Sequence, residues 1–494
     1  VERPACLQCI ALEPMSRKNL YLWLSVGAIL LAALLRWLII PAMRQMMTTD
    51  EAYYLLDAVS LIEVPRFTPF FPGNYGREAA FMYLLAPFTV GLGDWLFAGR
   101  VVAAFIAVVA VALTGRLGAD LFGWKGGVFS AVAMATLYWH VHMSHLVFRA
   151  MLMVPAGALA FLLFWRAAKH GGRKRWVLAG LALAFLFYTY FSARAWMGLI
   201  AGLMVLVAWR RPAMRRDAAV GLFVAGLACV PMLIYMVQNP DASIERMRDV
   251  GTFDLGTIFG NVLAWLRAPL GLSDPNPGHT LLNRPLFDLA EVVMIIAGGV
   301  ALIRVKNLRL QEATIGLMLL AALSPSLVSN YAPHYLRAVG ATLPFGLIIG
   351  VGASALFDHV TALGSKLGAS PLGAKRIAAT VLTAASMFTA YATGRDIYVG
   401  WLGQPESHMA MEEGFSSTVD VLLRKNVSGQ IVYFSPYLPA EALVRFAGRK
   451  LHADTATFNP EACVTVEDHP FWLVSKVANE QLLLRRLGEV ATVV

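Results

Sequence analysis

Long apolar runs recur along this chain from Leu20 almost to Ala392. A helix needs about 20 mostly apolar residues to cross a hydrocarbon core about 30 Å thick. Hydrophobic residues make up 58% of the chain and charged residues 15%, whereas soluble proteins carry about a quarter of charged residues. The pattern predicts a polytopic membrane protein with about eleven spans. The expected spans are residues 20–40, 96–117, 127–143, 148–168, 176–191, 196–209, 218–237, 289–303, 313–328, 339–356 and 377–392.

The net charge of +10 comes from Lys and Arg residues that gather in short clusters between the apolar runs. With the spans counted as above, these clusters fall on one side of the membrane, and an excess of Lys and Arg marks the cytoplasmic side. We therefore do not expect nucleic acid as a partner. The sequence predicts a multi-pass protein of the plasma membrane whose partner is the lipid bilayer and whose N-terminus is cytoplasmic.

The predicted domain organisation follows from shifts in composition. Residues 1–14 are expected to be a non-native or disordered tail, and residues 15–392 a transmembrane domain. Within that domain we expect interfacial helices in 41–95, because the apolar stretch 79–93 contains Pro87 and is short for a span, and an outside loop over 238–288.

The C-terminal region, residues 393–494, has patterns typical of an extracytoplasmic α/β domain. "GQIVYFSP", "ACVTVE" and "FWLVSK" are predicted strands, while "EGFSSTVDVLLRKN", "AEALVRFAGRK" and "NEQLLLRRL" are predicted helices. The fold class expected for the whole chain is mainly α: a polytopic membrane helix bundle with a small C-terminal α/β domain.

The stretch "TTDEAYYLLDAVSLI" places two carboxylates beside the first predicted span. Its apolar residues repeat at helical spacing and leave Asp50, Tyr54 and Asp57 on another face, which predicts an amphipathic interfacial helix. Thr48 and Glu51 match a capping box, so a structural role for Glu51 weighs evenly against a functional one. Asp50 is a candidate general base, because partial loss of hydration at a membrane rim makes an ionised carboxylate more basic.

The predicted outside loops all bring cations to the same side as this acidic pair. Such a convergence suits an anionic headgroup such as phosphate. For any single residue, nonspecific contact with lipid headgroups is an equal alternative. The residues concerned are Arg77, His140, His142, His145, Arg149, Arg194, His279, Arg284, His334 and Arg337.

The ordered set of motifs resembles a known superfamily. A first span is followed by an outside D-E with a Tyr, then by "GRE" before "AFMYLLAPF", "LFAGRVVAAFIAVVAVALTGRLGADLFG", "WHVHMSHLVFRAMLMVP", "DPNPGHTLLNRPLFD" and "HYLRAVGATLP". Over approximately Leu20 to Leu356 this resembles the GT-C integral-membrane glycosyltransferases. The closer likeness is to the family 39-like branch, related to protein O-mannosyltransferases and the lipid A aminoarabinose transferase.

The resemblance implies a bundle of membrane helices that transfers a sugar from a polyprenyl-phosphate carrier to a hydroxyl-bearing acceptor. By that resemblance Asp50 is the catalytic base, and Glu51 and Tyr54 are its neighbours in D-E-x-x-Y. Arg77 and Glu78 match the basic and acidic position of the next interfacial helix.

One departure from the pattern concerns metal. Many relatives have a second acid in the short outside turn, whereas "HVHMSHLVFRAMLM" contains no Asp or Glu. We therefore expect a site without a divalent metal or other cofactor, the lipid-linked sugar being a co-substrate. The alternative is a metal held by His140, His142 and His145, since imidazole is a common ligand.

The sequence assigns roles to the remaining residues as expectations. Because a phosphodiester-linked sugar leaves with an anion, one base and several cations suffice, and a single displacement gives inversion. The expected catalytic residues are Asp50 and Glu51. The expected donor-phosphate ligands are Arg77, Arg149, His334 and Arg337, and the expected substrate-binding residues are Tyr54, Glu78, His142, His279 and Arg284. Two further classes stay open, a transporter or lipid flippase and a noncatalytic membrane subunit.

Overall fold

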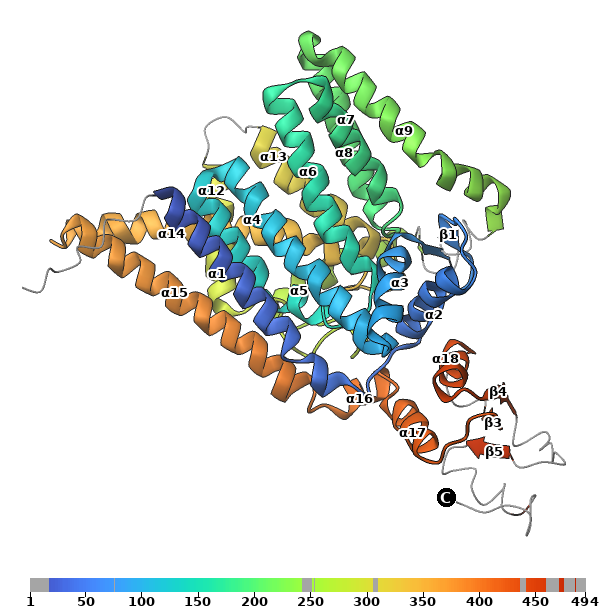
Figure 1. Ribbon diagram of the computed structural model, residues 1–494. Coiled ribbons are helices and arrows are strands. Elements are labelled where there is room, and N and C mark those ends of the chain that lie inside the picture. The colour runs from blue at the N-terminus through green and yellow to red at the C-terminus, as the bar shows by residue number, and fades with distance from the viewer. Residues whose placement is uncertain are drawn as a thin grey trace, which may run out of the picture.

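The computed structural model describes residues 17–74, 76–241, 251–252, 254–304, 310–435, 441–458, 471–474 and 485. The predicted tail 1–14, the predicted strand 462–467 and nearly all of the predicted helix 479–487 lie outside the described residues. The described chain is mostly helical, as predicted, and its helices form one bundle with a smaller group of elements at one side (Figure 1).

Eight helical segments of the described chain are long and apolar enough to cross a membrane, which supports a multi-pass membrane protein. Helices α7 and α12 have 15 residues each and fall below that length, and α4 contains two of the expected spans. The helices of the bundle are α1 (Arg17–Trp37), α4 (Trp95–Thr136), α6 (Met153–His170), α7 (Arg173–Phe187), α8 (Ala193–Arg210), α9 (Arg215–Gln238), α12 (Leu289–Ile303), α13 (Leu310–Leu327), α14 (Thr342–Lys366) and α15 (Pro371–Arg395).

Helix α4 folds back on itself at Gly123. The φ of Gly123 is +78°, a value that glycine adopts at little steric cost. A Cβ atom added to Gly115 would lie 2.8 Å from the Cβ of Ala131, although 16 residues of straight helix would place them about 24 Å apart. The two halves therefore pack against each other through small residues, and the predicted spans 96–117 and 127–143 form an antiparallel pair.

Short elements connect the spans at the side of the bundle that we call the loop face, where α2, α3 and the C-terminal domain lie (Figure 1). Helix α3 keeps Pro87 inside it and spans 13 residues, so the apolar stretch 79–93 is helical but short, as predicted. The remaining elements before the C-terminal domain are η1 (Ile40–Met43), α2 (Thr49–Glu63), β1 (Phe70–Phe71), β2 (Arg77–Glu78), α3 (Ala80–Leu92), α5 (Tyr138–Met143), η2 (Arg149–Leu152), η3 (Pro212–Met214), α11 (Leu255–Arg267), η4 (Ala268–Leu270) and η5 (Val339–Ala341).

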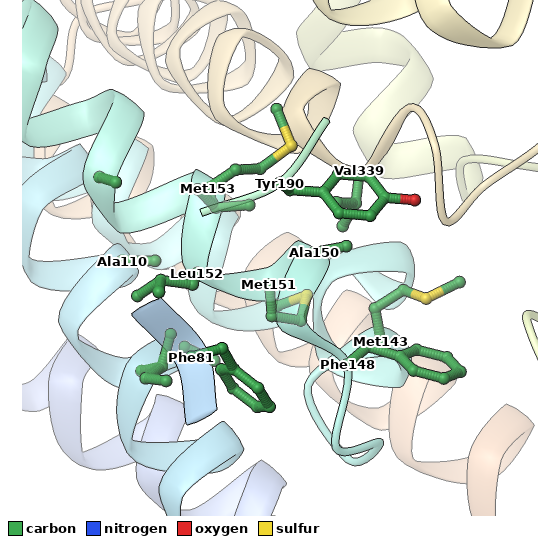
Figure 2. Packing of buried hydrophobic residues seen from close by; sticks show 14 of the residues in the cluster. Phe81, Ala110, Met143, Phe148, Ala150, Met151, Leu152, Met153, Tyr190 and Val339 are labelled. Atoms are coloured by element: carbon green, nitrogen blue, oxygen red, sulfur yellow. The ribbon is translucent and has the colours of Figure 1, made fainter. Parts of the chain in front are cut away.

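The buried core is continuous from the bundle into the loop face. Figure 2 shows part of it around the turn at residues 148–153. Phe148, Met151 and Met153 are fully or almost fully buried there, as are Tyr190 and Val339 from other elements. Because protein interiors pack at the density of organic crystals, this turn is held firmly beside α2 and α3.

The C-terminal domain is α/β in its described part. Its sheet is parallel with the order β4-β3-β5, so Val432 of β3 lies between Thr455 and Trp472. Within the described residues, the predicted strands at 429–436 and 471–476 and the predicted helices at 413–426 and 440–450 are confirmed. The elements are η6 (Asp396–Trp401), α16 (Pro405–Ala410), α17 (Glu413–Arg424), β3 (Ile431–Phe434), α18 (Glu441–Leu451), β4 (Asp454–Thr457) and β5 (Phe471–Val474).

Candidate functional site

The N-terminus of α2 is anchored by Glu51. The predicted capping box is present: the Thr48 side chain accepts from the Glu51 backbone N at 3.2 Å, and Glu51 Oε2 accepts from the Thr48 backbone N at 2.8 Å. The other oxygen, Oε1, accepts from the Val147 backbone N at 2.9 Å and lies 3.8 Å from Arg100 Nε. One carboxylate oxygen of this fully buried residue therefore caps α2, and the other ties the helix to Val147 and Arg100.

Asp50 is half-buried and lies one residue before this anchor. Its Oδ1 accepts from Asn74 Nδ2 at 2.6 Å, and in the described chain its Oδ2 has no hydrogen-bond partner. Tyr54 follows one turn later, and its ring packs edge-on against Phe81 at 6.1 Å. The guanidinium of Arg149 lies over the Tyr54 ring at 5.8 Å, so the predicted base and a predicted phosphate ligand share one neighbourhood.

Arg77 pairs with Asp57, not with Asp50. Its Nε donates to Asp57 Oδ2 at 2.8 Å, its Nη1 donates to the Gly73 carbonyl, and its guanidinium lies 4.7 Å from the Tyr53 ring centroid. Burial raises the pKa of the Asp57 carboxyl above its usual value, while the neighbouring Arg77 opposes that rise. The face predicted to carry Asp50, Tyr54 and Asp57 therefore meets two of the predicted arginines.

Arg149 forms a buried pair with Glu78. Its Nη1 donates to Glu78 Oε2 at 2.6 Å, and its Nη2 donates to the Gly76 carbonyl at 3.1 Å. Arg194 reaches the other oxygen of Glu78 at 3.3 Å, and Tyr190 lies against Arg149 at 5.2 Å. One carboxylate thus faces two guanidinium groups in this corner of the loop face.

The loop at 73–76 connects the acidic and basic parts of this group. The Gly73 carbonyl accepts from Arg77, the Asn74 side chain donates to Asp50, and the Gly76 carbonyl accepts from Arg149. Asn74 and Gly76 have φ values of +49° and +81°, conformations in which Asn and Gly are enriched. Gly73, Asn74 and Gly76 thereby contact the candidate base and two candidate phosphate ligands.

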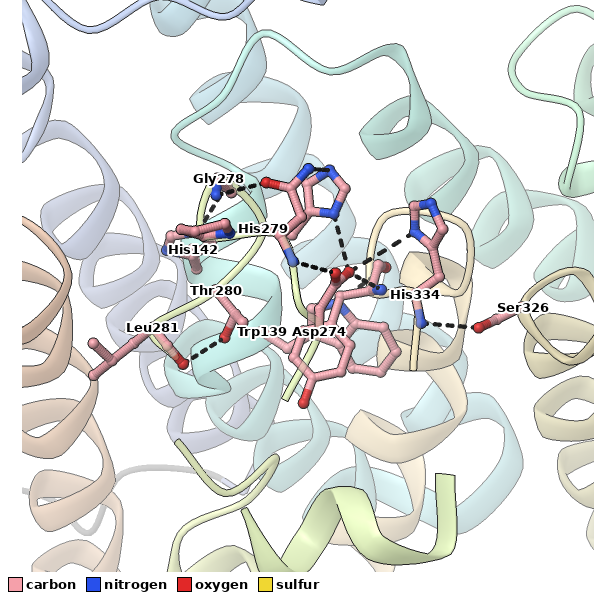
Figure 3. A network of polar contacts seen from close by, with 12 residues as sticks. Trp139, His142, Asp274, Gly278, His279, Thr280, Leu281, Ser326 and His334 are labelled. Atoms are coloured by element: carbon pink, nitrogen blue, oxygen red, sulfur yellow. Dashed lines mark hydrogen bonds and ion pairs between the residues drawn. The ribbon is translucent and has the colours of Figure 1, made fainter. Parts of the chain in front are cut away.

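A second polar cluster centres on Asp274 (Figure 3). Asp274 Oδ2 lies 3.0 Å from His279 Nδ1 and 3.8 Å from His334 Nδ1, and it accepts from the Tyr335 backbone N at 2.7 Å. The two imidazole rings stack at 5.3 Å, and the Tyr331 ring stacks on His334 at 4.8 Å. The predicted residues His279 and His334 are therefore brought together from two separate loops.

The two clusters adjoin through Phe148. The ring of Phe148 contacts His279 at 6.0 Å, and Arg149 is the next residue along the chain. Arg337, also a predicted phosphate ligand, donates to Ser329 Oγ at 2.6 Å in the segment that carries His334.

Among the described contacts, neither Arg284 nor His142 touches Asp50. Arg284 Nε donates to Asp396 Oδ2 at 2.8 Å, and its guanidinium stacks 3.9 Å from the Tyr138 ring centroid. His142 Nε2 lies 3.3 Å from the Gly278 carbonyl, with its ring against Tyr138 and Trp401. Both residues hold the loop before α12 against α5 and η6.

The predicted histidine-rich turn does not form a metal site in the described chain. His140 Nδ1 contacts Arg36 at 2.7 Å, and His145 Nε2 lies 3.3 Å from the Leu35 carbonyl, so these imidazoles serve to hold α1. Among the described residues, the group of His, Cys, Asp and Glu side chains close enough to hold an ion is Asp274, His279 and His334.

Comparison with known proteins gives the architecture. No protein-family model and no curated protein sequence matches the chain. Among solved structures, ArnT from Cupriavidus metallidurans bound to undecaprenyl phosphate aligns with a TM-score of 0.57 and 13% identity over 90% of this chain and 86% of that one. The Archaeoglobus fulgidus oligosaccharyltransferase tethered with an acceptor peptide aligns at 0.52 and 12% identity over 90% and 64%. Both belong to the GT-C superfamily.

The chain has the GT-C fold. A third structure of this fold, AglB from Archaeoglobus fulgidus in complex with an inhibitory peptide and a dolichol-phosphate, aligns at a TM-score of 0.50 with 14% identity over 90% of this chain and 65% of that one. The resemblance inferred from the ordered motifs therefore extends to the arrangement of the helices.

A cavity of about 340 Å³ lies between the C-terminal domain and the start of α4. It contains none of the residues predicted for the site. Its walls include apolar rings from both domains and charged groups of both signs. Among the lining residues are Arg44, Trp95, Phe415, Asp420, Phe446 and Lys450.

Two residues of the polar clusters, Asn74 and Asp274, were not predicted from the sequence to be site residues. Asn74 has a local signal, an Asn two residues before Gly76, which is typical of a turn with positive φ. Asp274 also has one, because its Oδ1 accepts from the Asn276 backbone N at 2.9 Å in an Asx turn. Neither signal names the distant partner, which is Asp50 in the first case and His334 in the second.

Proposed function

We propose that this chain transfers a sugar from a polyprenyl-phosphate donor to a hydroxyl-bearing acceptor by a single displacement that inverts the anomeric carbon. The observation that carries the proposal is the turn at 73–76, which joins the half-buried Asp50 carboxylate to the buried Arg149 guanidinium. The shared fold with ArnT, whose structure contains undecaprenyl phosphate, supports a donor of that class. Transfer takes place on the extracytoplasmic side.

Asp50 acts as the general base in this proposal. Asn74 donates to one carboxylate oxygen and fixes the orientation of the group, which leaves Oδ2 to accept the proton of the acceptor hydroxyl. Glu51 has both oxygens engaged with backbone and Arg100, so we assign it a positioning role. Its buried contacts hold the N-terminus of α2, and with it Asp50, against the segment at 147–149.

The arginines stabilise the phosphate that leaves. Arg149 keeps one buried nitrogen, Nε, without a hydrogen-bond partner in the described chain, and Arg77 donates to the Gly73 carbonyl of the same turn. Because the leaving group departs as an anion, prearranged cations replace the general acid that glycoside hydrolysis needs. The ring of Tyr54 and the carboxylate of Glu78 both contact the Arg149 guanidinium and position it.

The second cluster extends this surface. His334 and Arg337 would meet the donor phosphate from the opposite side of Phe148, whereas His279, His142 and Arg284 shape the loop before α12. No step of this mechanism passes through a metal ion.

The experiment is transfer of labelled sugar by the purified protein. Asp50→Asn keeps the volume and removes the basic oxygen, so we expect kcat to fall by about 10²–10⁴ with the donor KM little changed. Asp358→Asn is the matched control, because Asp358 is an exposed carboxylate paired with Lys125 at the opposite end of the bundle. A folded Asp50→Asn variant with undiminished transfer contradicts the role of Asp50. Counterflow in liposomes without formation of a glycosidic bond would instead establish a transporter.

A further inference from the structure

The cavity between the C-terminal domain and the start of α4 lies where a predicted span begins. One wall is the segment 93–96, at which α4 starts, and the other belongs to α17 and α18 of the C-terminal domain (Figure 1). Trp95 lies on this segment, and tryptophan is enriched where lipid tails meet water. The volume of about 340 Å³ falls within the range of about 300–1,000 Å³ that is typical of ligand pockets. The cavity is therefore large enough for a small ligand at the membrane surface.

Two lining side chains of opposite charge lack a charged partner in the part of the chain that the structure describes. Arg44 is exposed and makes neither an ion pair nor a side-chain hydrogen bond there. Asp94 is also exposed, and its Oδ1 accepts from the Phe97 backbone N at 3.1 Å as the cap of α4, without a cation in ion-pair contact. Among the described lining residues, the cavity thus presents an unpaired cation and an unpaired carboxylate.

Other charged groups of the wall are paired and hold the helices around the cavity. Lys450 of α18 donates to Asp420 Oδ1 of α17 at 3.1 Å. Arg449 donates to both carboxylate oxygens of Glu63, at the end of α2, at 2.6 and 3.0 Å. These contacts fasten α18 to α17 and to α2 without using Arg44 or Asp94. The two unpaired side chains therefore remain available to a ligand that carries both charges.

We propose that this cavity binds the headgroup of a membrane phosphatidylethanolamine, with its phosphate at Arg44 and its ammonium at Asp94. A guanidinium presents a planar fork of N–H donors that matches phosphate. An ammonium is a donor, and a carboxylate accepts its N–H groups. A headgroup that joins an anion to a cation through a short linker thus pairs with both side chains at once.

The apolar residues at the same place favour a lipid over a soluble zwitterion. The rings of Trp95 and Phe446 meet edge-on at 5.8 Å in the cavity wall. Leu92 and Phe97 stand on either side of the segment 93–96 and are 47% and 46% exposed. Exposed apolar side chains next to a membrane span have acyl chains as their natural contact. A ligand with a zwitterionic head and apolar tails matches both parts of this surface.

The bound lipid joins the two domains. Arg44 and Asp94 belong to the membrane domain, whereas Phe446 belongs to α18 of the C-terminal domain. A ligand that binds only when both walls are in place stabilises the docked arrangement by mass action. This role does not depend on the transfer reaction proposed above.

Lipid binding to the full-length protein tests the proposal. The protein is delipidated in detergent and titrated with dioleoyl-phosphatidylethanolamine, dioleoyl-phosphatidylcholine or dioleoyl-phosphatidylglycerol, and the bound fraction is measured by native mass spectrometry. Phosphatidylcholine has no N–H donor, and phosphatidylglycerol has no cation. We expect phosphatidylethanolamine to bind about tenfold more tightly than either, because each of the others loses a charge-assisted hydrogen bond. Equal affinity for the three lipids overturns the proposal.

Variants assign the two ends of the headgroup. Arg44→Gln should weaken phosphatidylethanolamine binding about tenfold or more. Asp94→Asn should remove the preference over phosphatidylglycerol, and it keeps the cap of α4 because Asn caps helices as well as Asp does. Arg267→Gln is the matched control, since Arg267 is an exposed arginine at the end of α11 outside the cavity. Equal weakening in Arg267→Gln and Arg44→Gln, or an unchanged lipid preference in Asp94→Asn, contradicts the assignment.

Free O-phosphoethanolamine separates a lipid from a soluble source of the same headgroup. We expect it to raise the unfolding temperature of the delipidated protein much less than phosphatidylethanolamine does, because it lacks the acyl chains. An equal rise with the free headgroup would exclude the membrane lipid as the ligand.

Discussion

Glu78 shows how much depends on a single buried carboxylate at the loop face. It is almost fully buried and receives Arg149 on one oxygen and Arg194 on the other. Removing one partner of a buried pair leaves the other charge uncompensated, which costs far more than the pair contributes as a whole. The position of Arg149, and with it the turn at 73–76, therefore depends on Glu78.

A substitution at this residue tests the point. We expect Glu78→Gln to lower the free energy of unfolding by on the order of 3 kcal/mol, because Arg149 stays buried without its counter-charge. Thermal denaturation in detergent measures the effect. Asp358→Asn, which breaks an exposed pair with Lys125, should cost less than about 1 kcal/mol. Equal losses in the two variants would show that Arg149 is solvated in solution.

At this scale, only part of the site could be predicted from the sequence. The capping box of Thr48 and Glu51 involves residues three apart and was correctly predicted. The contacts of Glu51 with Val147 and Arg100, and of Asp50 with Asn74, depend on how distant segments meet. The periodicity of residues within one segment does not indicate which distant segments will lie in contact.

At the scale of elements, some helices pack very closely where they cross. Gly352 of α14 faces α12, and a Cβ atom added to it would lie 1.8 Å from the Met294 carbonyl oxygen. The two helices therefore approach to a distance that only glycine permits at this position. Small residues at helix contacts serve the same purpose in membrane proteins generally.

A pair of glycine substitutions tests this crossing. Gly352→Ala should destabilise the protein by about 1–3 kcal/mol, because the methyl group meets a backbone atom and the helices must separate. Gly299→Ala in α12 is the matched control: its added Cβ would meet nothing within 4 Å, so higher helix propensity should leave stability unchanged or raised by up to about 1 kcal/mol. Thermal unfolding of both variants gives the comparison, and equal stability would place α12 and α14 farther apart.

At the scale of the whole molecule, the C-terminal domain is joined to the bundle by a short ordered connection. Met47 donates its backbone N to the Met411 carbonyl at 2.7 Å, and Trp95 of α4 meets Phe446 of α18 at 5.8 Å. His408 lies in this connection, where Nε2 contacts the Leu402 carbonyl at 2.7 Å and Nδ1 pairs with Glu413. The connection is therefore sensitive to the charge of one imidazole.

The pH dependence of stability tests that sensitivity. The contact with the Leu402 carbonyl, together with Glu413, raises the pKa of His408 above 6.5 despite partial burial. The stabilisation is therefore fully present below about pH 6.5 and is lost as the pH rises through the higher folded-state pKa. The unfolding temperature of the wild type should fall across this range more than that of His408→Gln. Parallel curves for the two proteins would contradict the assignment.

The overall architecture was more predictable than the site, for a physical reason. Whether a segment spans a membrane depends on its own length and hydropathy, which are local properties, so the helices of the bundle follow the expected spans. The hairpin of α4 shows the limit: the turn at Gly123 lies in the predicted gap, but the packing of Gly115 on Ala131 depends on the tertiary fold.

The turn at 73–76 has a consequence for a transferase. Its Gly76 carbonyl holds Arg149, and its Asn74 amide holds Asp50, so the two bonds are separated by only two residues of backbone. In the proposed reaction, a donor phosphate that binds Arg149 therefore contacts the same turn that orients Asp50. Donor binding and the orientation of the base are coupled through this turn.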